Sequence, residues 1–141
     1  MNKAGFSLAE VLVALIIVAI MSTVVALNLA DTAEEARITG TRAQLNTLET
    51  ALVQFKSQQG FLPTEAQGLE ALVREPTTPP LPPRYPQGGY LSSREVPADG
   101  WERPFLYLVP GRDNQPFEVI SYGADGFEGG TGADADLSTS D

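Results

Sequence analysis

The sequence predicts an α+β protein in which one long N-terminal helix packs, through its second half, on a small antiparallel sheet of about three strands. Three observations predict this fold. An uncharged apolar run extends from Val11 to Ala30, and an amphipathic helical pattern continues beyond it to Gln59. Two short segments within residues 104–122 have the composition of strands. The chain of 141 residues is long enough for one small domain besides the helix.

The apolar run is long enough to cross a membrane as a helix. Its roughly twenty residues would extend about 30 Å, the thickness of the hydrocarbon core of a bilayer. The run exceeds the core of a typical secretory signal, and no Ala-x-Ala site follows it. The small residue at a boundary is Gly5, which precedes the run. We therefore expect a cleaved leader over 1–5, a membrane-spanning segment over 6–30 and a domain over 31–141 that includes the second half of the helix.

Glu10 is an unusual residue for the start of a membrane helix. An ionisable group at mid-bilayer costs a few kcal/mol and usually has a partner or a function, although near the helix start it could equally snorkel to the headgroups. A spacing of four from this residue traces a slanting ridge of mostly small side chains: Glu10, Ala14, Val18, Ser22, Ala26 and Ala30. Small residues let helices approach closely in lipid. The ridge and Glu10 together favour assembly between helices.

The second half of the helix is amphipathic. A stripe of mostly apolar residues recurs at spacings of three and four: Ile38, Thr41, Leu45, Leu48, Leu52 and Phe55. This pattern predicts one continuous helix from about Ser7 to Gln59, ended by Gly60. The stripe lacks the heptad persistence of a coiled coil, so we expect it to pack on the chain's own domain.

Shorter elements follow Gly60. Thr64 and Gln67 match a T-x-x-Q capping box, which predicts a short helix over residues 67–73 that ends before Pro76. Prolines dominate residues 76–86, which predicts an extended loop with few backbone donors.

Two strands are predicted near the C-terminal end of the domain. Residues 104–109 and 117–122 have strand composition, and the turn-forming residues 110–116 between them predict a hairpin. A hairpin alone would be marginally stable, so we expect a third strand near Tyr90 and Leu91.

Composition excludes several classes of function. The formal net charge is −9, from 9 basic and 18 acidic residues, which argues against a nucleic acid partner. The sequence contains no cysteine and no histidine, which removes disulfides, thiol nucleophiles, most zinc sites and histidine-based catalysis. A serine and a lysine could in principle serve as nucleophile and base, but Lys56 and Ser57 are adjacent in sequence and therefore face different ways on a helix. We predict that the protein is not an enzyme.

The C-terminal segment is acidic and rich in glycine. Asp125, Asp134 and Asp136 occur among Gly123, Gly126, Gly129, Gly130 and Gly132. Oxygen donors of this kind suit Ca²⁺ better than zinc or copper, although the spacing is not that of an EF-hand. The residues taken alone favour a solvated acidic tail over a calcium site.

The string GFSLAE at the N-terminus resembles the processing site of type IV pilins and type II secretion pseudopilins. The resemblance implies that a prepilin peptidase cuts after Gly5 and methylates the new terminus at Phe6. It also implies that Glu10 meets the terminal amine of a neighbouring subunit during assembly. Such a pair relieves the desolvation cost that either charge would carry alone in lipid.

Motifs along the rest of the chain are similar to those of the major pseudopilin family of type II secretion. LPTEAQGLEALV at 62–73 resembles the family's YPTTEQGLQALV. GGYL at 88–91, DGWERPF at 99–105, SYGADG at 121–126, Gly129-Gly130 and DADL at 134–137 follow in the order of the family's GGYL, DPWGNPY, SLGADG, GG and DADI. The chain departs from the pattern in three ways: it lacks the proline usual near residues 27–29, it has Gly100 in place of the proline of DPWG, and its ending lacks GNW.

This resemblance implies a type IV pilin-like fold and a structural role. It implies Ca²⁺ bound by Asp125, Asp134 and Asp136, with the backbone carbonyls of Tyr122 and Phe127 as further ligands. The protein would sit in the inner membrane of a Gram-negative bacterium as a single-pass protein with its C-terminal domain in the periplasm. Its copies would then form a filament, the periplasmic pseudopilus, that helps to drive the export of folded proteins across the outer membrane. Partners would be other copies of the chain, minor pseudopilins, the inner-membrane assembly platform and the prepilin peptidase.

Two other interpretations remain open from the sequence. A monomeric, membrane-anchored calcium-binding module would share the helix and the acidic loop without needing the Gly5–Phe6 junction. A type IV pilus subunit would share the N-terminus, although such pilins commonly carry a C-terminal disulfide, which the cysteine-free chain cannot form.

Overall fold

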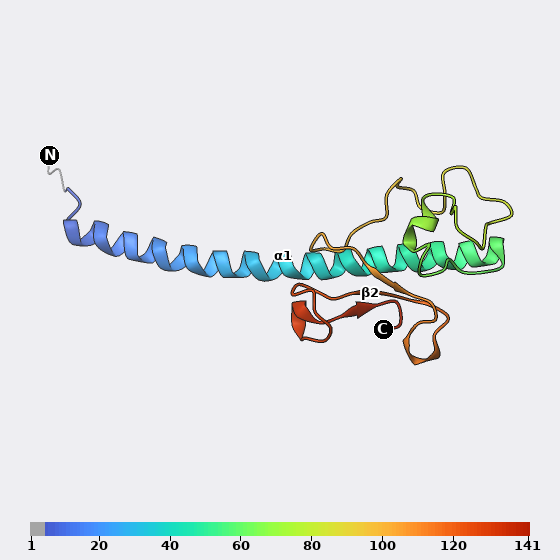
Figure 1. The fold of residues 1–141 in the computed structure, drawn as a ribbon. Helices are drawn as coiled ribbons and strands as arrows, with labels where there is room; N and C mark the ends of the chain where they lie inside the picture. The colour runs from blue at the N-terminus through green and yellow to red at the C-terminus, as the bar shows by residue number, and fades with distance from the viewer. Residues whose placement is uncertain (1–4) are drawn as a thin grey trace. The chain divides into compact units, whose positions relative to one another are not determined.

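The computed structural model describes residues 5–141, except for the side chains of residues 26–30. The backbone forms two compact units, Met1–Glu35 and Ala36–Asp141. One helix, α1 (Leu8–Gln59), runs through both units (Figure 1). Its 52 residues extend about 78 Å at 1.5 Å per residue. The predicted helix from Ser7 to Gln59 is thus confirmed to within one residue. Most of the predicted leader, residues 1–4, lies outside the described residues.

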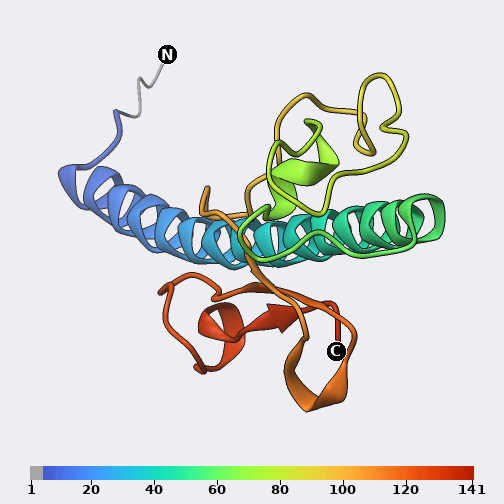
Figure 2. The ribbon, with the colours of Figure 1, turned by 45° about the vertical axis from the view of Figure 1, so that its right-hand side comes forward.

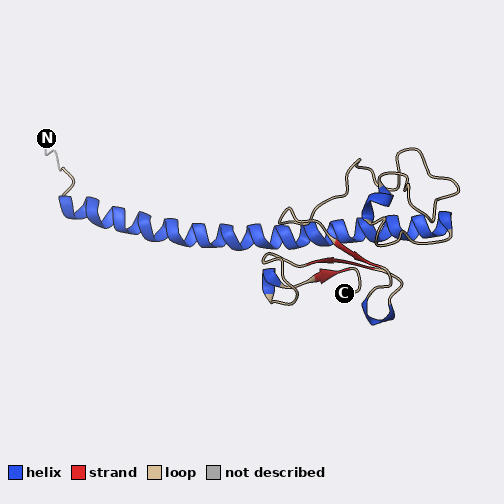
Figure 3. Ribbon diagram, in the orientation of Figure 1, coloured by secondary structure: helices blue, strands red, loops and turns tan. Residues whose placement is uncertain are grey.

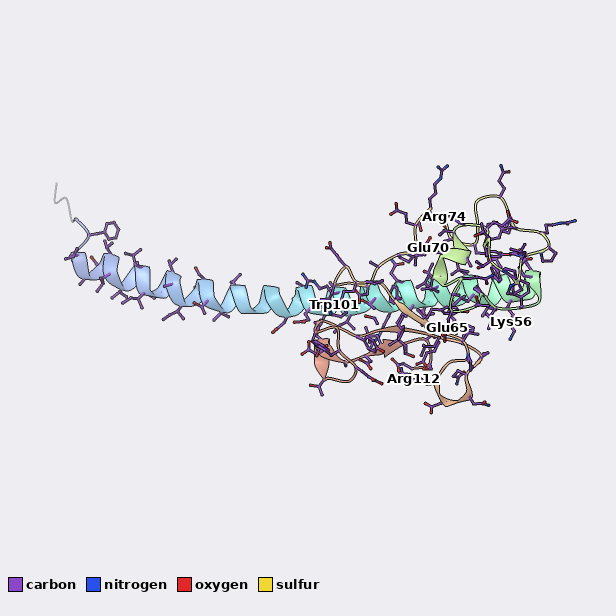
Figure 4. The ribbon with its side chains drawn as sticks, viewed as in Figure 1. Lys56, Glu65, Glu70, Arg74, Trp101 and Arg112 are labelled. Atoms are coloured by element: carbon purple, nitrogen blue, oxygen red, sulfur yellow. The ribbon has the colours of Figure 1, made fainter. Side chains whose placement is uncertain are left out.

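The N-terminal unit contains a long apolar stretch of the helix. The 18 residues Leu8–Val25 have a mean hydropathy of 2.7, and by length and composition they are sufficient to cross a membrane. Their large apolar side chains are exposed (Figure 4). The hydroxyls of Ser22 and Thr23 donate hydrogen bonds to the carbonyls of Val18 and Ala19, so these polar groups are satisfied within the helix.

In the C-terminal unit, α1 lies between two layers. The segment that follows the helix covers one side, and the sheet covers the other (Figures 1 and 2). The predicted stripe forms the core, because Leu48, Leu52 and Phe55 are fully buried. Gly60 ends the helix with φ of +83°, and its amide donates to the carbonyl of Lys56.

The sheet has three antiparallel strands in the order β1-β2-β3 (Figure 3). The strands are β1 (Leu106–Leu108), β2 (Glu118–Ser121) and β3 (Leu137–Ser138). Tyr107 lies opposite Val119, and Ile120 lies opposite Ser138. The predicted hairpin is confirmed as β1 and β2, and its connection includes the short 3₁₀ turn η2 (Arg112–Asn114).

The predicted third strand near Tyr90 and Leu91 is wrong. The third strand is β3, at the C-terminal end of the chain. The amide of Tyr90 donates to the carbonyl of Leu72, outside the sheet. The Tyr90 ring packs on Phe55, with ring centroids 5.0 Å apart, which accounts for the apolar character of this segment. Burial against α1, and not strand pairing, therefore explains why Tyr90 and Leu91 are apolar.

The predicted helix over residues 67–73 is shorter and tighter than expected. Only a 3₁₀ turn forms, η1 (Leu69–Leu72). The capping box itself is present, because the amide of Thr64 donates to Gln67 Oε1 and the amide of Gln67 donates to Thr64 Oγ1. Gly68 follows with φ of +62° and ψ of −169°, a conformation open mainly to glycine that prevents the turn from continuing as an α-helix. Gln67 Nε2 donates to the carbonyls of Thr78 and Pro80, which fixes the predicted proline-rich loop.

Candidate functional site

The N-terminus of α1 carries the first group of candidate residues. The amide of Ser7 donates to Glu10 Oε2 at 2.8 Å, and the amide of Glu10 donates to Ser7 Oγ at 3.2 Å. This reciprocal pair is an S-x-x-E capping box, which was not predicted although its spacing is present in SLAE at residues 7–10. Glu10 therefore caps its own helix. Its side chain and the ring of Phe6 are both exposed and accessible to a neighbouring molecule.

Part of the predicted small-residue ridge borders an apolar depression on the N-terminal unit. The depression has a volume of about 430 Å³ and is lined by Phe6, Glu10, Val11, Ala14, Leu15 and Val18. Three ridge residues, Glu10, Ala14 and Val18, are among them. The side chains of Ala26 and Ala30 lie outside the described residues. The described part of the ridge thus offers an apolar surface with one carboxylate at its edge.

The second group of candidates lies in the C-terminal loop, where two stretches of chain fold against each other. The amide of Ala124 donates to the carbonyl of Ala133 at 2.8 Å. The amide of Gly129 donates to Asp136 Oδ1 at 3.0 Å, and the amide of Phe127 donates to Asp125 Oδ1 at 3.0 Å. The loop is therefore closed by its own hydrogen bonds.

Gly123 makes this close packing possible. Its φ is +59°, and a Cβ atom at this position would lie 2.7 Å from the carbonyl oxygen of Ala133 and 2.8 Å from that of Ala135. No larger residue fits without moving the backbone. Carbonyl oxygens of residues 133 and 135 consequently face the 122–126 turn.

The donors in this loop suit a calcium ion by their chemistry. They are carboxylate and carbonyl oxygens, and the sequence has no imidazole or thiolate. Within residues 5–141, no three acidic side chains come close enough together to hold a metal ion. Asp125, Asp134 and Asp136 are thus brought into one closed loop without converging on a single point. Ca²⁺ also accepts carbonyl oxygens and water, so the donor set fits this ion without a three-carboxylate cluster.

A buried carboxylate, Asp99, connects this loop to the rest of the unit. Asp99 Oδ1 accepts hydrogen bonds from the amides of Trp101 and Arg103, and its Oδ2 accepts one from Ser121 Oγ at 2.6 Å. The side chain of Arg103 then reaches the loop, where its Nη1 donates to the carbonyl of Gly123 at 2.8 Å. Asp99 and Arg103 were not among the candidate site residues predicted from the sequence. The signal that could have identified them is the DGWERPF motif at 99–105, which contains both residues.

A second buried carboxylate, Glu118, holds the C-terminal end of the chain. It accepts hydrogen bonds from the Arg112 guanidinium at 2.8 and 3.0 Å, and from the hydroxyls of Ser138 and Ser140. The hydrogen bonds from Arg112 lower the pKa of Glu118 to about 2, although burial opposes this shift. The same hydrogen bonds raise the pKa of Arg112 (labelled in Figure 4) above its usual range. Arg112 also lies 3.7 Å from Glu128 of the acidic loop.

Known proteins resemble the chain over its whole length. Residues 28–140 match the family described as type II secretion system protein G, and residues 1–26 match the prokaryotic N-terminal methylation motif. Curated relatives are named type II secretion system core protein G. The relative from Vibrio cholerae is 40% identical over 96% of this chain and 90% of its own length. The relative from Pseudomonas aeruginosa is 36% identical over 96% of this chain and 94% of its own length.

A solved structure shares the fold. It is the major pseudopilin of the type 2 secretion system of enterohaemorrhagic Escherichia coli, which aligns with a TM-score of 0.64 and 32% identity. The alignment covers 79% of this chain and 93% of the solved one. The likeness supports the predicted pilin-like arrangement of a long helix on a three-stranded antiparallel sheet.

Proposed function

The chain belongs to the type II secretion system protein G family, the major pseudopilins, and we propose that its copies stack through their apolar helices into the periplasmic pseudopilus of that system. Its role in secretion is structural. The observation that carries the proposal is the exposed apolar first third of α1, Leu8–Val25, which lies within the residues matched by the methylation motif. An exposed surface of this kind needs lipid before assembly and neighbouring helices after it.

The geometry of assembly follows from the use of two different surfaces. A copy that contributes its N-terminal amine to Glu10 of the next copy makes a head-to-tail interface. An interface of this type does not close on itself and produces a helical filament. We expect cleavage after Gly5 and methylation at Phe6 by a prepilin peptidase. Further partners are minor pseudopilins and the inner-membrane assembly platform, and growth of the filament in the periplasm would help to move folded proteins outward.

The test of this proposal is the variant Glu10→Gln, expressed in a cell with a working secretion system. Without the carboxylate, the amine of a neighbouring copy would remain unpaired in an apolar interface. The variant should still enter the membrane and be cleaved, while the yield of sedimentable filaments should fall on the order of a hundredfold. Glu34→Gln, which changes an exposed carboxylate farther along α1, is the matched control and should assemble normally. Normal filament yield from Glu10→Gln would contradict the assembly contact.

We also propose that the C-terminal loop binds Ca²⁺ through Asp125, Asp134 and Asp136, with the carbonyls of Tyr122 and Phe127 as further donors. The closed loop and its all-oxygen donor set support this assignment. The bound ion would compensate for the charge of the three carboxylates and for the entropy lost by a glycine-rich loop.

Thermal unfolding of the full-length chain in detergent micelles tests the calcium site. At a calcium concentration one hundred times the Kd, binding stabilises the folded state by about 2.7 kcal/mol, which raises Tm by on the order of 5–10 °C relative to chelator. Asp125→Ala should abolish this difference. The control Asp31→Ala, at an exposed position of α1, should preserve it. Equal Tm values of the unmodified chain in calcium and in chelator would refute the site.

A further inference from the structure

We propose that Arg103 is a positioning residue that holds the 122–126 turn of the C-terminal loop in its closed form before any cation binds. The proposal rests on the proposed calcium loop for its functional meaning, while its test is carried out in chelator and reads the contact itself. Its consequence is that this chain needs calcium less for loop closure than it would with an uncharged residue at position 103.

The backbone of Arg103 is fixed at the base of the contact. Its amide donates to Asp99 Oδ1 at 2.9 Å, and its carbonyl accepts a hydrogen bond from the amide of Asp99 at 2.9 Å. Asp99 is only 6% exposed and is held in turn by the hydroxyl of Ser121 in β2. Arg103 therefore projects from a rigid turn that is anchored to the sheet.

The side chain of Arg103 lies directly on the loop backbone. Its Nη1 donates to the carbonyl of Gly123 at 2.8 Å. A Cβ atom at Gly126 would lie 2.7 Å from this Nη1 and 2.9 Å from Cζ, so the guanidinium covers Gly126 at van der Waals distance. Gly126 has φ of +75°, and its amide donates back to the carbonyl of Tyr122. The guanidinium thus contacts both ends of the turn that contains Asp125.

This contact supplies part of what a bound cation would supply. A hydrogen bond from a charged donor is stronger than one from a neutral donor, and it places fixed positive charge in the same turn as an acidic side chain. Arginine is also suited to the role because its planar group can donate and pack at once. The DPWGNPY pattern that the sequence resembles has asparagine at the corresponding position. Asparagine is shorter and uncharged, so it cannot make the same contact.

Hydrogen exchange of the full-length chain in detergent micelles tests the proposal through the amides of Ala124 and Gly126, which close the turn. In chelator, Arg103→Asn should speed their exchange by about tenfold or more. Arg103→Lys keeps the charge but loses the planar group, and should give an intermediate rate. Arg74→Asn, which removes an exposed arginine paired only at 3.7 Å with Glu70, is the control and should leave the rates unchanged. The amides of Leu48 and Leu52 in the core of α1 provide an internal reference.

The outcomes separate this proposal from the calcium site. Faster loop exchange in Arg103→Asn, reversed by added calcium, supports both proposals. Faster exchange in Arg103→Asn, together with loop exchange in the unmodified chain that calcium does not slow, supports the role of Arg103 and refutes the calcium site. Unchanged loop exchange in chelator overturns the role of Arg103, whether or not calcium slows it. Equal acceleration at Leu48 and Leu52 would also overturn it, because that result would mean a general loss of stability.

Discussion

At the scale of single residues, Glu118 and Arg112 show how one buried carboxylate organises the C-terminal end. Glu118 is 1% exposed, yet both of its oxygens are occupied. Its partners come from the turn after β1 and from Ser138 and Ser140 near the end of the chain. A buried charge is tolerated only where such partners satisfy it. This carboxylate therefore holds β3 and the residues after it against β2.

We predict that this carboxylate makes the unit sensitive to acid. The pKa of Glu118 falls from its ordinary value of 4.5 to about 2 because Arg112 donates to it. A depressed pKa stabilises the folded state above pH 4.5, and this stability is lost as the pH falls from about 4.5 toward 2. Chemical denaturation measured between pH 2 and pH 7 should show this loss in the unmodified chain. Glu118→Gln should lower the free energy of unfolding by about 1.5–3 kcal/mol at neutral pH and flatten the pH dependence.

Glu128→Gln is the control for this prediction. It removes another carboxylate near Arg112, which lies 3.7 Å from the guanidinium and is 73% exposed. Exposed pairs contribute about 1 kcal/mol or less, so the change should be small. A pH profile of Glu118→Gln that is as steep as that of the unmodified chain would contradict the assignment.

At the scale of elements, one glycine sets the distance between α1 and the 99–103 turn. A Cβ atom at Gly100 would lie 2.5 Å from the carbonyl oxygen of Arg37. The amide of Gly100 also donates to Thr41 Oγ1 at 2.8 Å, and Thr41 is fully buried in the stripe of the helix. Proline, which the resembled pattern has at this position, could not donate this hydrogen bond. The departure from the pattern therefore has a physical use in this chain.

Two glycine substitutions should have opposite effects on the stability of this packing. Gly100→Ala should destabilise the unit by about 1–3 kcal/mol, because the added methyl group forces the turn away from the helix. Gly40→Ala should stabilise it by about 0.5–1 kcal/mol, because Gly40 lies within α1 and, apart from its chain neighbours and the backbone of its own helix, nothing lies within 4 Å of the added methyl group. Denaturant titration of both variants in micelles measures the two changes. Equal effects would show that the close approach at Gly100 is unimportant.

The elements that the sequence predicts correctly are those with long or local patterns. The helix has an apolar run and then a regular stripe, and the β1–β2 hairpin has a turn between two strand-like segments. The third strand could not be found in this way because β3 has only two residues, Leu137 and Ser138. Pairing across the sheet defines it, since Ser138 lies opposite Ile120 and Leu137 lies opposite Ser121. Local composition carries no signal for such a long-range contact.

The candidate site residues also differ in whether their signal is local in the sequence or depends on long-range contacts. Gly5, Phe6 and Glu10 form a contiguous motif, and the acidic loop has a distinctive composition, so both could be selected from the sequence. Asp99 and Arg103 could not, because their importance depends on a loop about twenty residues farther along the chain. Charged residues at exposed turns are common, and only the structure shows that Asp99 is buried.

At the scale of the whole molecule, the two units divide the work of assembly. The N-terminal unit has an exposed apolar helix that requires a nonaqueous environment, and the C-terminal unit has its own core. A filament subunit needs both features, because the apolar helix joins the copies and the C-terminal unit stays folded in water. The net charge of −9 keeps the water-exposed surface soluble and disfavours nonspecific association. In the proposed filament, the placement of Glu10 at the start of the apolar segment would link membrane insertion to assembly.

The central claim is that this chain is processed and used as a pseudopilin, and intact mass analysis with N-terminal analysis tests it most directly. The protein should be purified from the membrane of the cell that naturally makes it. We predict a chain that lacks residues 1–5, begins at Phe6 and carries one added methyl group on its terminal amine. A protein that retains Met1, or that begins at any residue other than Phe6, would contradict the account.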